Sequence, residues 1–243
     1  RRRFGAALRR CQPGQPRHRH GDADVSQTLR VSRLAASITV LGPGTRVALW
    51  VQGCTIGCPG CASVDTWDAA GGSSWTLDSL ADEIVHAAVA TAATGVTVTG
   101  GEPFQQPAAV AELLAHVRDR WEGTAVPDVL VFTGYAAAAA RRRSAPLWDA
   151  ADIVVAGPYR RDRPSDHPLL GSANQTIEAV SELGRERLAA MAPGRARLQV
   201  STDDGALSLV GMPDPGDLDR LRAALAARGI HLRDVSWDER SAG

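Results

Sequence analysis

Segments of strand type and of helix type alternate through the middle of this chain. The strand-type runs cover residues 47–52, 95–99, 129–133 and 153–156. The helical patterns between them cover residues 76–93, residues 105–121 and parts of the alanine-rich segment that ends at Ala150. This alternation predicts an α/β fold with a mostly parallel sheet, curled as a partial (β/α)6 barrel. In such sheets the ligand-binding loops follow the carboxyl ends of the strands.

Three regions are expected along the chain. Residues 1–27 carry seven arginines and no acid before Asp22, which predicts a disordered basic tail. Residues 28–177 form the core domain, with an early apolar run at 38–41, and residues 178–243 form an α/β extension that completes or flanks it. The extension is expected to contain a helix at 178–191, a hairpin of residues 197–201 and 207–210 around Asp203-Asp-Gly205, a helix at 214–228 and a strand at 230–237.

Three cysteines with CxxxCxxC spacing follow the run at 47–52, in the loop Gly53-Cys-Thr-Ile-Gly-Cys-Pro-Gly-Cys61. Structural zinc normally takes four protein ligands, usually in two separated pairs, and the sequence has no second pair. A 4Fe-4S cluster is ordinarily held by four thiolates, so three would leave one iron open to a small molecule. Two alternatives remain: a redox-active cysteine pair, and a zinc site completed by Cys11, His18 or His20.

A second motif follows the strand-type run at 95–99. It reads Thr99-Gly-Gly-Glu-Pro103. Two adjacent glycines let the backbone approach a ligand closely, and Glu102 places a carboxylate where an ammonium group could pair with it. A plain strand-to-helix turn with a surface glutamate explains the same residues.

The composition narrows the class of protein. With 243 residues, 44% hydrophobic and 22% charged, the chain is expected to be globular. No apolar run approaches ~20 residues and no hydrophobic signal segment opens the chain, so we expect a cytoplasmic protein without a membrane partner. Basic and acidic residues balance at 27 each, which predicts no nucleic-acid partner, and the absence of lysine excludes Schiff-base chemistry.

Together, the cysteine loop and the glycine-glycine-glutamate turn resemble the radical S-adenosylmethionine superfamily. Within it, the chain is most similar to the activating enzymes of anaerobic ribonucleotide reductase, over residues 38–177. That similarity rests on Gly42-Pro-Gly-Thr-Arg46, Cys58-Pro-Gly-Cys61, Thr66-Trp67, Thr133-Gly-Tyr135 and Gly171-Ser-Ala-Asn-Gln175.

The resemblance implies cofactors and site residues. Its cofactors are a 4Fe-4S cluster, ligated by Cys54, Cys58 and Cys61, and S-adenosylmethionine. The methionine ammonium is expected at Gly100, Gly101 and Glu102, while Thr133 and Asn174 are weaker candidates for lining the cofactor pocket. Polar residues such as Asn174 and Gln175 equally often only satisfy the backbone of a loop.

The resemblance also implies a reaction and its partners. One electron from an external donor such as flavodoxin or ferredoxin cleaves S-adenosylmethionine to methionine and a 5′-deoxyadenosyl radical. This radical takes hydrogen from a glycine of a glycyl-radical enzyme. A small molecule or a peptide as the hydrogen donor is the alternative, and a zinc-stabilised binding module without activity is the alternative from another class.

The chain departs from the family pattern in two places. Related enzymes carry a motif like D-x-x-x-D-G-K after the fourth strand, whereas this chain keeps Asp152 but has Ala156 and Pro158 at the second acid and the lysine. The aromatic residue often found beside the last cysteine is also missing, since Gly60 and Ala62 flank Cys61. Other side chains would then have to pack on the adenine.

Overall fold

The computed structural model describes residues 9–10, 27–122, 126–191, 197–203, 206–232 and 235–236. Its strands are β1 (Arg9–Arg10), β2 (Thr28–Ile38), β3 (Arg46–Val51), β4 (Ser73–Thr76), β5 (Gly95–Gly100), β6 (Asp128–Thr133), β7 (Ile153–Ala156), β8 (Thr176–Ala179), β9 (Leu198–Asp203) and β10 (Ala206–Gly211). Its α-helices are α1 (Leu77–Thr91), α2 (Pro107–Asp119), α3 (Ala137–Arg143), α4 (Ala145–Ala150), α5 (Glu182–Ala189) and α6 (Asp217–Ala226). Two short 3₁₀ turns are η1 (Val64–Thr66) and η2 (Pro103–Gln105).

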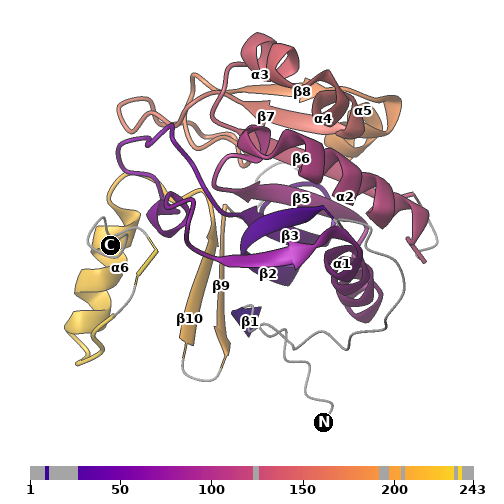
Figure 1. The fold of residues 1–243 in the computed structure, drawn as a ribbon. Coiled ribbons are helices and arrows are strands. Elements are labelled where there is room, and N and C mark those ends of the chain that lie inside the picture. The colour runs from indigo at the N-terminus through magenta and orange to yellow at the C-terminus, as the bar shows by residue number, and fades with distance from the viewer. Residues whose placement is uncertain are drawn as a thin grey trace.

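One large sheet organises the core, with strand order β1-β2-β3-β5-β6-β7-β8 and β4 paired to β2 (Figure 1). Strands β3, β5, β6 and β7 run parallel, and β2 and β8 flank them antiparallel. The predicted α/β fold built on a parallel sheet is confirmed, and the parallel part comprises these four strands. All six residues of β3 are buried, as expected for a strand covered on both faces.

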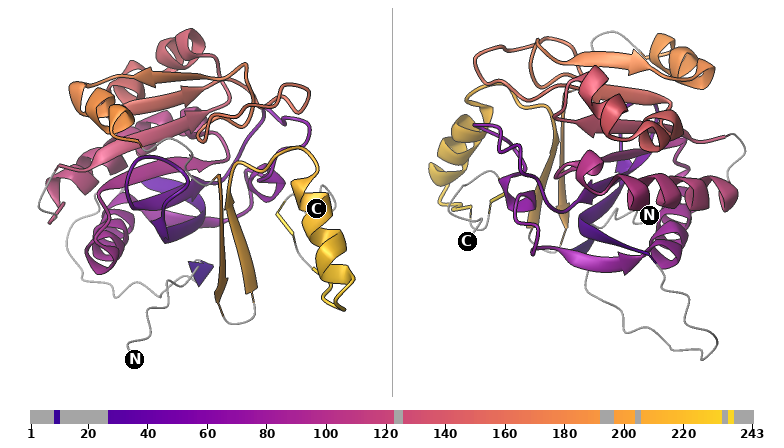
Figure 2. Two further views of the ribbon diagram at one scale, coloured as in Figure 1. Left: turned by 180° about the vertical axis from the view of Figure 1, so that it is seen from behind. Right: turned by 45° about the horizontal axis from the view of Figure 1, so that its top comes forward.

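The two faces of the sheet are covered differently. Helices α1, α2 and α4 pack on one face and bury apolar side chains such as Ile84, Leu113 and Leu147 against it. The hairpin β9–β10 lies against the opposite face (Figure 2). There Val210 packs with Trp50. Helix α5 covers another part of this face, through Leu188 against the cluster of Leu130 and Ile153, and the pocket lies where the hairpin faces the sheet. No helix in the described part of the chain is both long and apolar enough to cross a bilayer.

Several predicted elements are confirmed with small shifts in their ends. Helix α1 begins after Thr76, the first residue of the predicted helical segment, which is its N-cap and accepts a hydrogen bond from the backbone N–H of Ser79. The strand-type runs correspond to β3, β5, β6 and β7, and the hairpin forms as β9 and β10. Its predicted turn residues Asp204 and Gly205 lie outside the described residues.

Three predicted elements were wrong in extent. The first strand is β2, which ends where the predicted run at 38–41 begins, because two register shifts interrupt the alternation of apolar residues along it. The predicted helix at 178–191 begins only at Glu182, since residues up to Ala179 pair with β7 as β8. In the predicted strand at 230–237 the described residues are not in a strand.

Most of the predicted basic tail lies outside the described residues. Within it, Arg9–Arg10 form β1 and pair with Leu34 and Arg33 of β2. The division into tail, core and extension stays a prediction.

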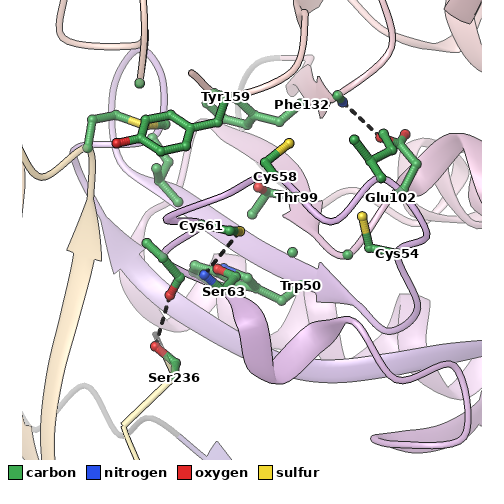
Figure 3. Close-up of a pocket in the computed structure, with 18 of the residues that line it drawn as sticks. Trp50, Cys54, Cys58, Cys61, Ser63, Thr99, Glu102, Phe132, Tyr159 and Ser236 are labelled. Atoms are coloured by element: carbon green, nitrogen blue, oxygen red, sulfur yellow. Dashed lines mark hydrogen bonds between the residues drawn. The ribbon is translucent and has the colours of Figure 1, made fainter. Parts of the chain in front are cut away.

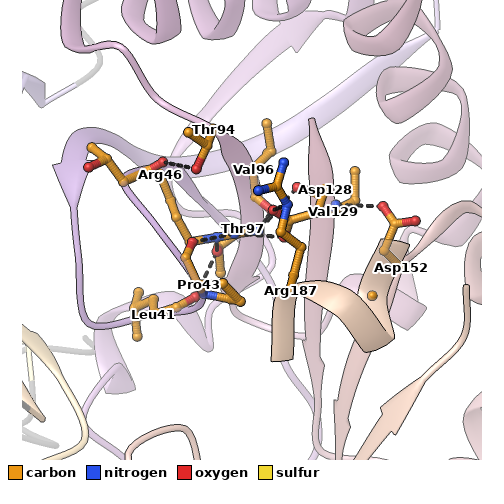
Figure 4. A network of polar contacts seen from close by, with 12 residues as sticks. Leu41, Pro43, Arg46, Thr94, Val96, Thr97, Asp128, Val129, Asp152 and Arg187 are labelled. Carbon is orange, nitrogen blue, oxygen red and sulfur yellow. Dashed lines mark hydrogen bonds and ion pairs between the residues drawn. The ribbon is translucent and has the colours of Figure 1, made fainter. Parts of the chain in front are cut away.

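A buried arginine joins the first loop to the parallel strands. Arg46 is fully buried and forms an ion pair of 2.7 Å with Asp128, which is also fully buried (Figure 4). It donates hydrogen bonds to Thr97 Oγ1 (2.6 Å) and to the backbone oxygens of Pro43 and Val96 (2.9 and 2.6 Å). Arg46 of the Gly42–Arg46 motif therefore holds the architecture together, away from the pocket.

Candidate active site

A pocket lies at the carboxyl ends of β3, β5 and β6, between the sheet and the C-terminal hairpin (Figure 3). Seven of the eight predicted site residues line it: Cys54, Cys58, Cys61, Gly100, Gly101, Glu102 and Thr133. Residues about 80 positions apart in the sequence thus line one pocket, as expected for loops that follow the carboxyl ends of parallel strands.

Backbone hydrogen bonds hold the start of the cysteine loop. The N–H of Gly53 donates to Thr66 O (2.8 Å) and that of Cys54 to Trp67 O (3.1 Å), at the end of η1. Gly53 O in turn accepts from the N–H of Glu102 (2.8 Å). The cysteine loop and the glycine-glycine-glutamate turn are therefore joined directly.

Gly100 is required by close packing at the end of β5. Its φ is +97°, which side chains of L-residues rarely adopt. A Cβ there would also lie 2.7 Å from Trp50 Cα. The turn can present its backbone to the pocket only with glycine at this position.

The three thiols are half-buried and differ in their surroundings. Cys61 Sγ accepts from the backbone N–H of Ser63 (3.4 Å) and from the side chain of Trp67, and Cys58 accepts from the backbone of Tyr159. Burial raises the pKa of the Cys58 and Cys61 thiols, and these hydrogen bonds offset part of that increase. Donors directed at sulfur are one of the means by which proteins adjust iron–sulfur potentials.

Glu102 lines the pocket although only 1% of it is exposed. Its carboxylate accepts from the N–H of Phe104 (2.9 Å), from Thr133 Oγ1 (2.8 Å) and from the N–H of Gly134 (2.8 Å). Burial raises the pKa of Glu102, and these three donors partly oppose the increase. The ion pairs found among the described residues do not include Glu102, so a cationic group from a ligand would satisfy its charge.

Other predicted positions lie outside the pocket lining or serve the fold. Asn174 is absent from the lining within the described residues; it donates to Pro158 O (2.8 Å), whereas its neighbour Gln175 lines the pocket. Asp152 pairs with Arg118 (2.9 Å) and accepts from the N–H of Val129 (2.8 Å). Ala156 is 2% exposed and packs in the helix-side core, so an acid there would be buried among apolar groups.

Sequence reasoning missed several residues of the pocket. Tyr159 follows β7 and lies beside the cysteine loop, where a Cβ on Gly60 would meet its ring at 3.6 Å. The expectation that ligand-binding loops follow the carboxyl ends of strands could have indicated Tyr159, because it comes just after the predicted strand-type run at 153–156. The strand β2 residue Arg33 and the C-terminal residues 209–213 and Ser236 also line the pocket, and no motif marks them.

The donor set fits a 4Fe-4S cluster better than a single ion. Within the described part of the chain, no three side chains of His, Cys, Asp or Glu converge closely enough to hold one metal ion. A zinc ion would need its thiolates about 2.3 Å from one point. In a 4Fe-4S cluster, by contrast, the thiolates bind different irons and need not converge. Cys11, His18 and His20 lie outside the described residues.

Comparison with known families agrees with this donor set. Residues 40–178 match the family described as "4Fe-4S single cluster domain", which is more than half of the chain. Three cysteines beside a buried glutamate on a parallel α/β sheet, together with this match, define an iron–sulfur enzyme of the radical S-adenosylmethionine class, with a 4Fe-4S cluster and S-adenosylmethionine as cofactors.

Individual relatives narrow the class further. The anaerobic ribonucleoside-triphosphate reductase-activating protein of Escherichia coli K12 is 31% identical over 144 residues, which cover 57% of this chain and 90% of the relative. The proteins of the same name from Salmonella typhimurium LT2 and phage T4 are 32% and 29% identical, over 90% and 86% of their lengths and 57% of this chain. The chain belongs to this family of activating enzymes.

A solved structure, that of QueE from Escherichia coli, overlaps 84% of this chain and 92% of its own. Its identity is 15% and its TM-score is 0.36, which is too low to support an inference.

Proposed function

We propose that this protein activates a separate enzyme by generating a radical on one of its glycines, and that the enzyme is an anaerobic ribonucleoside-triphosphate reductase. The observation that carries the proposal is the placement of Cys54, Cys58, Cys61 and Glu102 around one pocket, in a chain whose relatives are named as activators of that reductase. An external one-electron donor, of the flavodoxin or ferredoxin type, belongs to the same proposal.

The residues of the pocket have separable tasks. Cys54, Cys58 and Cys61 would hold the cluster, and the Ser63 N–H and the Trp67 side chain, which donate to Cys61, would stabilise its thiolate. Glu102, fixed by three donors, would bind the methionine ammonium as a charge-assisted pair.

The cofactors supply the cleavage chemistry. The cluster that Cys54, Cys58 and Cys61 would hold would supply one electron for the cleavage of S-adenosylmethionine to methionine and a 5′-deoxyadenosyl radical, and that radical would take a hydrogen atom from the glycine. The side chains around them contribute binding, orientation and exclusion of water.

The test uses anaerobically reconstituted protein, dithionite, S-adenosylmethionine and the reductase. We expect 5′-deoxyadenosine by chromatography and a glycyl-radical doublet by electron paramagnetic resonance, and neither with the Cys58→Ala variant. Deoxyadenosine formation that depends on a small molecule, without a doublet, would overturn the partner assignment and favour a small-molecule donor. A wild-type protein that binds no iron would overturn the cofactor assignment.

A further inference from the structure

One side of the pocket is built by the C-terminal part of the chain. Leu209, Val210 and Gly211 of β10 line it, followed by Met212 and Pro213 and, further on, Ser236. All of these residues lie beyond residue 178, where the family match ends. The matched part of the chain therefore does not by itself enclose the pocket. We call residues 209–213 the C-terminal wall.

The hairpin that carries the wall is fixed to the sheet. The side chain of Gln199 accepts from Thr39 N (2.9 Å) and from Thr39 Oγ1 (3.1 Å), and it donates to Ser37 O (3.0 Å). Val210 is 8% exposed and packs with Ala48 and Trp50 on the inner face. Polar and apolar contacts therefore both anchor the hairpin to the sheet.

Ser236 contacts the residues that follow the cysteine loop. Its hydroxyl donates to Ala62 O (3.0 Å) (Figure 3). Its backbone oxygen accepts from the N–H of Asp65 (3.2 Å). Ala62 follows Cys61 in the sequence. Asp65 is itself held by Arg33 of β2, at 2.7 Å. Two hydrogen bonds thus tie the C-terminal segment to the residues that fix Cys61.

We propose that the C-terminal segment completes the active site in two ways: Ser236 positions the loop that carries Cys61, and the C-terminal wall selects the hydrogen donor. This inference rests on the proposed function. The wall residues are apolar or glycine, so the hydroxyl and amino groups of a polar small donor would be left unpaired against it. A main-chain segment whose reacting residue is glycine brings no polar side chain to the wall, and its N–H and C=O groups can pair within the partner protein. The wall therefore favours a peptide donor over a polar small molecule.

The positioning role of Ser236 is tested on the cluster-free protein. Ser236→Ala removes the hydrogen bond to Ala62, and iodoacetamide should then alkylate Cys61 about fivefold faster, as expected for the loss of one hydrogen bond. Peptide mapping by mass spectrometry measures the rate at Cys61 alone. Ser74→Ala, in the exposed position of β4, is the matched control. Equal rates in the two variants would overturn this role, whatever the protein's activity.

The selective role of the wall is tested by narrowing it. Met212→Trp should lower the glycyl radical formed per 5′-deoxyadenosine about tenfold, whereas Met191→Trp, outside the pocket lining, should leave that ratio unchanged. If Met212→Trp does not fold by circular dichroism, Leu209→Ala replaces it and should increase deoxyadenosine formed without radical transfer. An unchanged ratio in the folded wall variant would overturn the selection. A wild-type protein that gives deoxyadenosine but no doublet would instead refute the proposed function.

Discussion

Arg33 is the one basic side chain among the described residues that line the pocket. Its guanidinium lies 4.8 Å from the centroid of the Trp50 ring and pairs with Asp65 at 2.7 Å. Its charge is close enough to Cys61 for the two to interact electrostatically. Since a cluster with three thiolates becomes more negative on reduction, a fixed positive charge beside it stabilises the reduced form.

Replacing this charge should change the reduction potential of the cluster. We expect Arg33→Gln to shift the potential to more negative values, and Arg33→Lys, which keeps the charge, to shift it less. A redox titration followed by electron paramagnetic resonance measures both. An unchanged potential in Arg33→Gln would show that the ion pair with Asp65 already neutralises Arg33.

Glu102 should leave a signature in the stability of the cluster-free protein. Burial raises the pKa of Glu102, so the folded protein holds this proton more tightly than the unfolded chain. The free energy of unfolding should therefore fall as pH rises from the ordinary pKa of a glutamate through the raised one. In Glu102→Gln this fall should be smaller. Urea titrations across that range measure it, and parallel curves for the two proteins would contradict the expectation.

At the scale of elements, Arg46 and Asp128 join the loop before β3 to β5 and β6. Their ion pair is fully buried, and burial raises the pKa of Asp128 in spite of the attraction from Arg46. Removing Arg46 leaves the buried Asp128 with the more distant Arg187, at 3.6 Å, as its ionic partner among the described residues, which compensates its charge less well. Arg46→Met should therefore lower the free energy of unfolding by about 3–5 kcal/mol.

The double variant Arg46→Met, Asp128→Leu separates charge from packing. Because it removes the fully buried charge of Asp128 and leaves only the partly exposed Arg187 without its partner, it should be more stable than Arg46→Met alone. Denaturant unfolding of the cluster-free proteins measures the comparison. A double variant less stable than the single one would show that the hydrogen bonds of Arg46, rather than the charges, dominate.

Elements with a regular pattern of apolar residues were predicted most accurately from the sequence. Helix α1 and strands β5, β6 and β7 have unbroken patterns, and they were predicted within a few residues. Strand β2 was missed because its register shifts interrupt the pattern, and β8 because its residues read as the start of a helix. The pocket residues in loops that follow the parallel strands were predictable, because ligand-binding loops in such sheets lie at the carboxyl ends of the strands. Arg33, the C-terminal wall and Ser236 were not, because they reach the pocket through tertiary packing alone.

At the scale of the whole molecule, the described residues that line the pocket all lie between Arg33 and Ser236. We therefore expect a protein lacking residues 1–26 to bind the cluster and stay brown after anaerobic reconstitution. Iron and zinc analysis together with the visible spectrum measure this. A colourless truncated protein, made from a full-length protein that holds zinc, would support the zinc-stabilised binding module.

The cysteines and Ser236 are far apart in the sequence, which affects the order in which the pocket can form during synthesis. A chain emerging from the ribosome places Cys54, Cys58 and Cys61 in solution long before Ser236 has been synthesised. Domains fold as units during synthesis, and here the two hydrogen bonds that hold the residues after Cys61 wait for that late segment. Until then the residues after Cys61 lack these two contacts. Insertion of the cluster is therefore best timed after Ser236 has been synthesised and has bound to Ala62 and Asp65.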